Sequence, residues 1–348
     1  MKDKKRALII GGTGQDGAHI AYHLLEMGCE VYCGFRRGSA TNTWRLQHLG
    51  VLQKVTLINI NVDEPFNLVD IFKSVKPDLI FHLAGESFVA DSFVHPVSTL
   101  HANTIGTLNV LEALRHTVPS AKLFFASSSE VFGKTESGHL LKEEDRCEPM
   151  NPYGISKMTA QSLVKMYRDT YGIFGVVGIL FNHEGPLRGR NFVTRKIAYN
   201  IARIRLESSG DPLLLGSLDS SRDWGAASDY SLAMIKTLLL ESPDDYVFAT
   251  GKLTSVREFL KYCAESAGFQ PVFDGSGCEE TCYDGISGRL LAKVSESYFR
   301  PHDTSARAGC SKKLSEATDW AGSRSVQKIA EEMVLVDLKR RKQGLINV

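Results

Sequence analysis

Short apolar runs alternate with longer segments of helical periodicity along the first half of this 348-residue chain. Apolar positions at helical spacing predict helices over residues 16–27, 66–75, 99–115 and 152–171. The short apolar runs predict strands over residues 7–10, 31–35, 55–60, 79–83, 123–126 and 176–180. Because strands that alternate with helices build βαβ units, we expect an α/β fold with a doubly wound parallel sheet.

The pattern is less regular beyond residue 182. Helices are predicted over residues 193–206, 230–239, 256–267 and 326–342, and the loops between them are rich in glycine and charge. The sequence shows no internal repeat, low-complexity tract or linker. We therefore expect a sheet domain formed mainly by residues 1–181 and a smaller α/β lobe formed mainly by residues 182–348, with the chain crossing back to the sheet domain.

Composition excludes several classes of protein. Hydrophobic residues make up 43% of the chain and charged residues 23%, which is ordinary for a globular protein. The net charge of +1 provides no field to attract nucleic acid or an anionic membrane, so any anion must be bound by local arginines. No apolar run approaches the roughly 20 residues of a membrane-spanning helix. The basic N-terminus leads into a strand rather than a signal-peptide core, so we expect a cytoplasmic protein.

Cysteine usage agrees with that location. The seven cysteines are odd in number and scattered along the chain. Cys278 and Cys282 lie close together, but no second pair stands at metal-ligand spacing. We expect reduced thiols and no metal site.

A glycine-rich turn follows the first predicted strand. Gly11, Gly14 and Gly17 let the chain turn tightly and let the backbone approach a pyrophosphate at the N-terminus of the next helix. A tight strand-to-helix turn is the plainer interpretation, but the βαβ continuation favours a Rossmann dinucleotide site. The turn reads Gly11-Gly12-Thr13-Gly14-Gln15-Asp16-Gly17.

The end of the second strand indicates which dinucleotide is bound. An acid at this point would favour NAD by binding the ribose 2′-hydroxyl. This chain has Arg36 and Arg37 there instead, and two guanidinium groups suit a 2′-phosphate. Solvated surface arginines are the alternative, but the position favours NADP.

The helix that begins after Asn151 carries the candidate catalytic pair. Asn151 is a good N-cap, and Pro152 suits the first helical position. Tyr153 and Lys157 are four residues apart and share one helical face. A free phenol has a pKa near about 10, and a neighbouring lysine cation favours its ionised form. The pair is therefore suited to removing the proton of a sugar hydroxyl.

The segment Ser127-Ser128-Ser129-Glu130 follows the strand predicted over residues 123–126. Ligands of open α/β sheets bind at this end of the strands. Ser128 can hydrogen-bond the reacting hydroxyl. Plain alcohol oxidation needs no second base, whereas removing a carbon-bound proton beside a new ketone does, so Glu130 suggests that oxidation is only the first step. A solvated loop acid is the alternative.

These motifs resemble those of extended short-chain dehydrogenases/reductases, and specifically the GDP-mannose 4,6-dehydratase family. The resemblance covers nearly the whole chain, and its most specific marks lie in the second half. They are the segments at residues 178–184, 192–196, 222–225, 255–259 and 298–301.

The resemblance implies roles for individual residues. Ser128, Glu130, Tyr153 and Lys157 correspond to the catalytic group. Besides the glycine turn, the two arginines, Tyr153 and Lys157, the NADP contacts would be Asn61, Val62, Leu83, Ala84, Ser87, His183 and Arg188. The contacts to the GDP-sugar would be Asn182, Lys196, Arg222, Arg257 and Arg300.

Several positions depart from the family pattern. Ser128 replaces a threonine, and Asn61 replaces an aspartate expected near adenine. The catalytic group therefore looks intact, while the substrate pocket does not look standard. The remaining departures are Gly85-Glu86 for Ala-Gln, Ser98 for tyrosine, Leu187 for arginine and Asp303 for glutamate.

The expected reaction is dehydration of GDP-mannose or a related GDP-hexose or GDP-heptose to a 4-keto-6-deoxy sugar, with NADP recycled internally. Two alternatives remain open: a GDP-sugar 4-dehydrogenase, reductase or epimerase, and a catalytically silent NADP-sensing protein. In the resembled family the loop after the second strand joins subunits. Residues 38–44 here are polar and end in Trp44, so we expect a homodimer or homotetramer.

Overall fold

The computed structural model describes residues 4–38, 42–136, 138–207, 210–298 and 306–345. The chain forms two compact units. It leaves the first unit after Phe181 and returns to it twice. The first unit comprises Met1–Phe181, Ala227–Ala249 and Gly309–Gly322, and the second comprises Asn182–Ala226, Thr250–Ala308 and Ser323–Val348.

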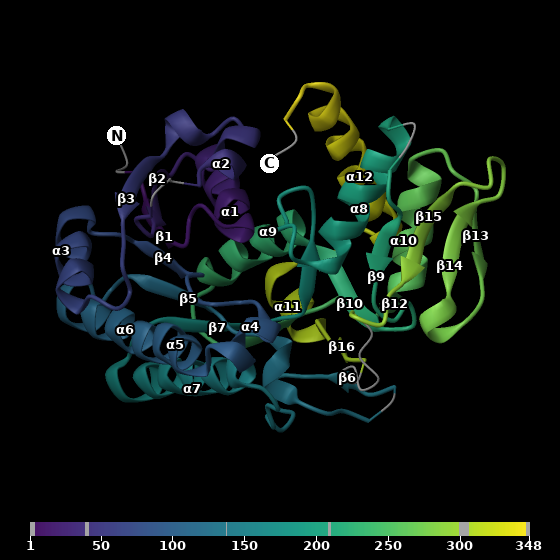
Figure 1. Ribbon diagram of the computed structural model, residues 1–348. Coiled ribbons are helices and arrows are strands. Elements are labelled where there is room, and N and C mark those ends of the chain that lie inside the picture. The colour runs from purple at the N-terminus through teal and green to yellow at the C-terminus, as the bar shows by residue number, and fades with distance from the viewer. Residues whose placement is uncertain (1–3, 39–41, 137, 208–209, 299–305, 346–348) are drawn as a thin grey trace. The chain divides into compact units, whose positions relative to one another are not determined.

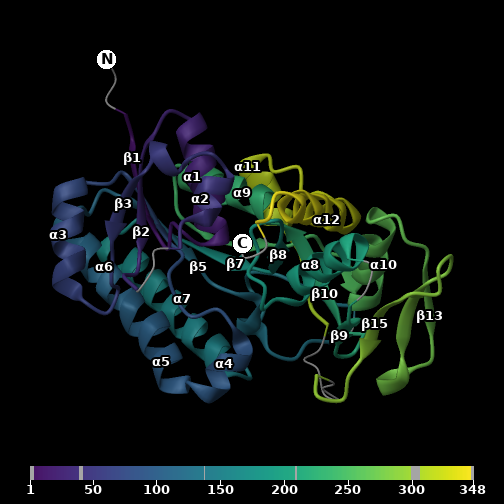
Figure 2. The same ribbon diagram turned by 45° about the horizontal axis from the view of Figure 1, so that its top comes forward.

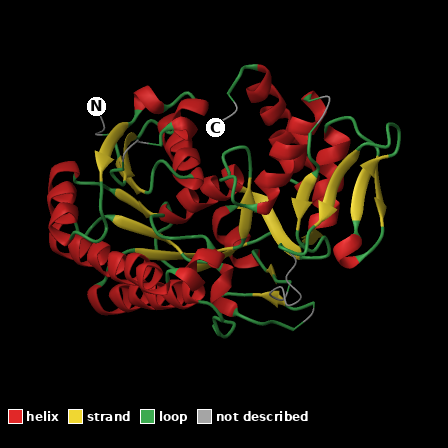
Figure 3. Ribbon diagram, viewed as in Figure 1, coloured by secondary structure: helices red, strands yellow, loops and turns green. Residues whose placement is uncertain are grey.

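A seven-stranded sheet forms the centre of the first unit, in the order β11-β7-β5-β4-β1-β2-β3. All neighbouring strands in it are parallel, which confirms the predicted doubly wound fold class. Figure 3 shows these strands in yellow with red helices on both sides. The strands are β1 (Arg6–Ile10), β2 (Glu30–Phe35), β3 (Thr56–Asn59), β4 (Leu79–His82), β5 (Lys122–Ala126), β7 (Gly175–Leu180) and β11 (Asp245–Phe248).

Helices cover both faces of this sheet (Figures 1 and 2). α6 packs against α3 and α7 on one face, and α1 packs against α9 on the other. The helices are α1 (Gln15–Glu26), α2 (Trp44–His48), α3 (Pro65–Val75), α4 (Val89–Val94), α5 (Pro96–Leu100), α6 (Gly106–Thr117), α7 (Pro152–Tyr171), α9 (Ala227–Leu238) and α11 (Lys312–Thr318). Shorter elements are the 3-10 helices η1 (Leu52–Lys54) and η3 (Ser129–Phe132), the π-helix η2 (His101–Ile105), β6 (Leu140–Leu141) and β16 (Ala308–Gly309).

The central strands are apolar because helices cover the sheet on both faces. Every residue of β4 and β7 is buried. Phe124 of β5 packs edge-on against Phe248 of β11, with ring centroids 5.8 Å apart. Parallel strands buried on both faces give continuous apolar runs, and this is why the sequence pattern located them.

The predicted helix over residues 99–115 is longer and less regular than expected. It begins at Pro96 as α5, widens into the π-helix η2 and continues as α6. Asn103 lies in the π-helix, where its side chain accepts from Glu86 N at 2.9 Å and donates to Ser156 Oγ at 2.9 Å. These tertiary bonds have no counterpart in the apolar pattern. The short helices α2 and α4 were not predicted either, and residues 39–41 of the predicted polar loop lie outside the described residues.

The second unit contains two small sheets, ordered β12-β10-β8 and β13-β14-β15-β9, packed with three helices. The helices predicted over 193–206 and 326–342 are confirmed, whereas the helix predicted over 230–239 is α9 of the first unit. The elements are β8 (Asn182–Glu184), α8 (Val193–Leu206), β9 (Leu213–Leu215), β10 (Ser221–Ala226), β12 (Leu253–Ser255), α10 (Val256–Ser266), β13 (Pro271–Asp274), η4 (Gly277–Glu279), β14 (Thr281–Asp284), β15 (Leu290–Val294) and α12 (Val326–Lys342).

α8, α10 and α12 pack on one another around a core that includes Trp224, Phe259 and Met333. Trp224 and Phe259 meet edge-on with ring centroids 5.4 Å apart. The second unit thus has its own apolar core. Across the described part of the chain, no helix combines the length and the apolar character that crossing a bilayer requires.

Candidate active site

The loops that follow five neighbouring strands carry most of the predicted site of the first unit. β3, β2, β1, β4 and β5 are consecutive in the sheet. Because the strands are parallel, their carboxyl ends meet at one edge. The residues at that edge are the glycine turn after β1, Arg36 and Arg37 after β2, Asn61 and Val62 after β3, Leu83, Ala84 and Ser87 after β4, and Ser128 and Glu130 after β5.

The glycine turn brings the backbone of β1 against the end of β4. Gly11 has φ +93°, and a Cβ there would lie 3.0 Å from Ala84 N. A Cβ on Gly17 would lie 2.4 Å from Gly11 O, so α1 packs directly on the turn. No side chain caps α1 at Gly14, and its first turn presents backbone N–H groups. This arrangement is typical of an anion-binding helix N-terminus.

The residues after β2 are exposed, whereas those after β3 make hydrogen bonds within the first unit. Arg36 and Arg37 are exposed, and the backbone of Arg37 donates to Asn59 Oδ1 at 3.1 Å. Asn61 Oδ1 accepts from Asp63 N at 3.2 Å, and Val62 O accepts from Asn109 Nδ2 at 2.9 Å. Arg36 and Arg37 therefore place two exposed guanidinium groups just after β2.

The candidate catalytic pair lies on the first turns of α7. Tyr153 and Lys157 are both buried, with 8% and 5% of their surface exposed. Lys157 Nζ donates to Ala126 O at 2.9 Å, so the lysine is tied to the end of β5. Burial lowers the pKa of Lys157 to about 8. Lys157 therefore lies directly against the strand end that precedes Ser128.

Ser128 and Glu130 are held in the same place. Ser128 Oγ accepts from Glu130 N at 3.2 Å and so caps the 3-10 helix η3. A Cβ on Gly154 would lie 2.6 Å from Glu130 O, which shows how closely α7 approaches this segment. Asn151 Nδ2 donates to Glu130 Oε2 at 2.8 Å. The structure thus brings the predicted serine, acid, tyrosine and lysine together around one end of α7.

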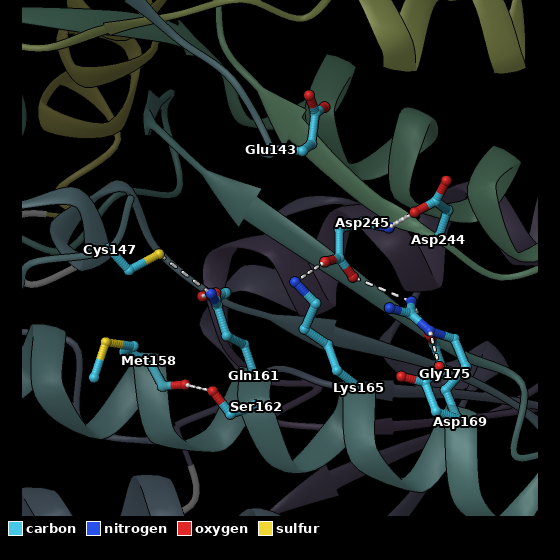
Figure 4. A network of polar contacts seen from close by, with 12 residues as sticks. Glu143, Cys147, Met158, Gln161, Ser162, Lys165, Asp169, Gly175, Asp244 and Asp245 are labelled. Carbon is cyan, nitrogen blue, oxygen red and sulfur yellow. Dashed lines mark hydrogen bonds and ion pairs between the residues drawn. The ribbon is translucent and has the colours of Figure 1, made fainter. Parts of the chain in front are cut away.

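Sequence analysis missed a second contact between α7 and this strand end. Gln161 Oε1 accepts from the buried Ser127 Oγ at 2.7 Å. Gln161 Nε2 in turn donates to Cys147 Sγ at 3.6 Å (Figure 4). Farther along the same helix, Lys165 Nζ lies 2.6 Å from Asp245 Oδ2 (Figure 4). Gln161 stands four residues after Lys157, and that spacing is the signal that could have revealed it.

Two of the positions that depart from the family pattern contact each other. Ser98 Oγ donates to Glu86 Oε1 at 2.7 Å, and Thr99 Oγ1 donates to Glu86 Oε2 at 2.8 Å. A Cβ on Gly85 would lie 3.6 Å from Lys157 Nζ, so this segment adjoins the catalytic lysine. Leu187 is buried in the second unit, where an apolar side chain is suitable.

The second unit contains a cavity of about 240 Å³. Two of the predicted substrate residues, Asn182 and Arg222, line it. The buried carboxylate of Glu184 also lines it and accepts from Thr194 Oγ1 at 2.5 Å. The remaining lining residues are Phe192, Val193, Thr194, Gly216, Ser217, Ser220, Trp224, Val256 and Tyr298.

Lys196 and Arg257, two further predicted cations of the second unit, contact neighbouring side chains. Lys196 Nζ lies 4.1 Å from the ring centroid of Tyr298, and burial lowers the pKa of Lys196. Arg257 pairs with Asp219 Oδ1 at 2.5 Å and with Glu280.

Of the remaining predicted residues of this unit, the structure describes Arg188 and His183 but not Arg300. Arg188 Nε lies 3.1 Å from Glu184 Oε2, and His183 is buried on β8. Arg300 lies outside the described residues. Within the described ranges, no three histidine, cysteine or acidic side chains are grouped to hold a metal ion.

The parallel sheet, the glycine turn after β1 and the Tyr153–Lys157 pair define a Rossmann-type short-chain dehydrogenase/reductase. The model of one family, described as GDP-mannose 4,6 dehydratase, matches residues 8–333. The chain therefore belongs to the GDP-mannose 4,6-dehydratase family.

Individual relatives agree with this assignment. The chain is 38% identical to the GDP-mannose 4,6-dehydratase of Yersinia enterocolitica, over 97% of this chain and 95% of that protein. It is 37% identical to the GDP-mannose 4,6 dehydratase of Cricetulus griseus, over 97% and 92% of the two chains.

Solved structures share the fold at lower identity. The dTDP-glucose 4,6-dehydratase of Bacillus anthracis in complex with NAD matches with a TM-score of 0.80 at 18% identity, over 99% of this chain and 100% of that one. RMD from Pseudomonas aeruginosa complexed with NADPH matches with a TM-score of 0.77 at 24% identity, over 97% and 100%.

Proposed function

We propose that this chain is a GDP-sugar 4,6-dehydratase that recycles NADP within each catalytic cycle. The observation that carries the proposal is the position of Glu130. Its backbone N–H donates a hydrogen bond to Ser128, and its carboxylate accepts one from Asn151. Asn151 is the N-cap residue of the helix that carries Tyr153 and Lys157. An alcohol-oxidising group with a second acid beside it is the set that dehydration after oxidation requires.

The proposed roles follow from the chemistry of each group. Tyr153, assisted by Lys157, removes the proton of the C4 hydroxyl, and Ser128 donates a hydrogen bond to the same oxygen. The new C4 ketone acidifies C5, and Glu130 takes the C5 proton. Of the two protons now held by Tyr153 and Glu130, one leaves with the C6 hydroxyl as water, and the other is added to C5 when hydride reaches C6. The hydride chemistry, removal from C4 and addition to C6, would be supplied by NADP bound at the carboxyl ends of the first-unit strands.

The edge of the first-unit sheet fits a dinucleotide phosphate. The close approach at Gly11 and the first turn of α1, which no side chain caps, suit the pyrophosphate. We assign Arg36 and Arg37 to the 2′-phosphate and Asn61 and Val62 to the adenine end. The other assigned cofactor contacts are Thr13, Gly14, Gln15, Asp16, Gly17, Leu83, Ala84, Ser87, Tyr153, Lys157, His183 and Arg188.

The second-unit cavity is the proposed site for the nucleotide end of the substrate. Arg222 on its wall and Lys196 beside Tyr298 provide positive charge for a pyrophosphate. Asn182, Arg257 and Arg300 complete the proposed set. The departures at Glu86 and Ser98 leave the sugar open, and we propose GDP-mannose or a related GDP-hexose or GDP-heptose.

Incubation with a panel of GDP-sugars, followed by mass spectrometry, tests this function. The expected result is loss of one water from one of them with no net consumption of cofactor. Inversion without water loss, or net turnover of NADP(H), would instead identify an epimerase or a dehydrogenase. Bound NADP with no change in any GDP-sugar would identify a silent cofactor-sensing protein. The cytoplasmic location stays a prediction.

NADP(H) is expected to bind more tightly than NAD(H) because of Arg36 and Arg37. Losing a charge-assisted hydrogen bond costs about 1.5–3 kcal/mol, so the double change Arg36→Ala with Arg37→Ala should raise the Kd for NADPH at least about tenfold. The Kd for NADH should change little. Titration calorimetry measures both, and Arg146→Ala, which removes an exposed arginine paired with Glu148, serves as the control. Equal weakening of both cofactors would refute the 2′-phosphate assignment.

A homodimer or homotetramer is expected in solution. α4 and α5 pack on α7, and Phe93 and Val97 on them are 63% and 79% exposed. Exposed apolar side chains grouped on neighbouring helices are typical of a subunit interface. Light scattering should give a multiple of the monomer mass, and Phe93→Glu with Val97→Glu should reduce it. A wild-type monomer at working concentration would contradict this prediction.

A further inference from the structure

The N-cap residue of α7 makes two different contacts. Asn151 is buried, with 4% of its surface exposed. Its Oδ1 accepts from Gly154 N at 2.7 Å and so caps the helix. Its Nδ2 donates to Glu130 Oε2 at 2.8 Å. One amide group therefore joins the start of the catalytic helix to the carboxylate of the proposed C5 base.

The contact with Asn151 holds the carboxylate of Glu130, whose backbone is held by other groups. The backbone of Glu130 is already held by Ser128 Oγ and by the close approach of Gly154. A carboxylate can accept about four hydrogen bonds, so the bond from Asn151 leaves acceptor capacity for a proton from the substrate. The side chain of Asn151 thereby ties the carboxylate to the start of α7.

Among good N-cap residues, only asparagine has both an oxygen that caps the helix and an amide N–H group that can donate to Glu130. Serine and aspartate also cap helices through a side-chain oxygen. Serine lacks the Nδ2 donor, and its hydroxyl is shorter. Aspartate has two acceptor oxygens and no donor, so it would place a second negative charge against Glu130. Capping alone does not account for the bond from Asn151 to Glu130.

We propose that Asn151 is a positioning residue for the second half of the reaction, in which it holds Glu130 for removal of the C5 proton. This inference rests on the proposed dehydratase function. It assigns Asn151 no contact with the substrate and no part in oxidation at C4. Asn151 therefore acts only through Glu130.

The test compares Asn151→Ser and Asn151→Asp, which retain a helix cap, with Asn151→Ala, which does not. Stopped-flow absorbance follows bound NADPH after each variant is mixed with the GDP-sugar that the wild-type protein dehydrates. NADPH should form at the wild-type rate in the serine and aspartate variants, which keep the cap of the helix that carries Tyr153. Its decay should slow roughly 10- to 100-fold in the serine variant, as expected for a lost bond to a charged group, and more in the aspartate variant. With a C5-deuterated substrate, the isotope effect on NADPH decay should be larger in these variants than in the wild type.

Thermal unfolding separates the cap from the bond to Glu130. Of the alanine and serine variants, only Asn151→Ala should lower the Tm noticeably, whereas both should slow NADPH decay. Wild-type decay in Asn151→Ser, or equal slowing of NADPH formation and decay, would overturn the positioning role while the dehydratase function stands. If the wild-type protein dehydrates no GDP-sugar, the proposed function fails, and the role of Asn151 fails with it.

Discussion

Replacing Glu130 by glutamine is expected to stop the reaction after oxidation at C4. Glutamine keeps the size of the side chain and can still interact with Asn151, but it cannot take a proton. Oxidation depends on Tyr153, Lys157 and Ser128 and should survive. Removal of the C5 proton should slow about 10²- to 10⁴-fold, the usual effect of losing a general base. Bound NADPH should therefore accumulate, which absorbance at the nicotinamide band measures directly.

Tyr153→Phe provides the matched control. It removes the hydroxyl that starts the oxidation, so no NADPH should form with the same substrate. Both variants should thus release little product, but NADPH should accumulate only in Glu130→Gln. If Glu130→Gln releases dehydrated product at the wild-type rate, Glu130 is a loop acid and the dehydration must use another base.

The helices that could be predicted are those in which the apolar spacing and the residues at the helix ends indicate the same bounds. α8 begins and ends where the apolar spacing placed it, and α12 follows Ser325, a residue that caps it through its side chain. β13, β14 and β15 could not be predicted. Their residues are only partly buried, so they lack the continuous apolar runs of β4 and β7, and their pairing with one another and with β9 depends on the fold. Short strands are specified by their neighbours rather than by their own composition.

The candidate site shows the same division. The loops after consecutive strands could be predicted because a parallel sheet brings its carboxyl ends to one edge. The bond from Asn151 to Glu130 joins residues 21 apart across a loop, and it depends on how closely Gly154 lets α7 approach. The pairing of Arg257 with Asp219 and Glu280 likewise depends on the fold. A motif therefore identifies the groups, while the fold decides what each one contacts.

Lys157→Met is expected to abolish activity and to stabilise the protein at neutral pH. Activity should fall by about 10²-fold or more because Tyr153 loses the cation that favours its ionised form. Burial lowers the pKa of Lys157 from 10.5 to about 8, so the folded state holds this charge at a cost below pH 8. Methionine removes that cost but loses the bond to Ala126 O. The free energy of unfolding at pH 7 should rise by on the order of 2 kcal/mol.

The stability difference between Lys157→Met and the wild type should depend on pH in a definite direction. Between pH 8 and 10.5 the unfolded chain binds more protons at Lys157 than the folded chain does, so the wild-type deficit shrinks as the pH rises. Urea denaturation at pH 7 and at about pH 9.5 should show the advantage of Lys157→Met decreasing. Lys165→Met on the same helix is the control, because Lys165 is half-buried against Asp245 and its loss should destabilise the protein. An Lys157→Met variant that is less stable than wild type at pH 7 would show that the bond to Ala126 outweighs the cost of burying the charge.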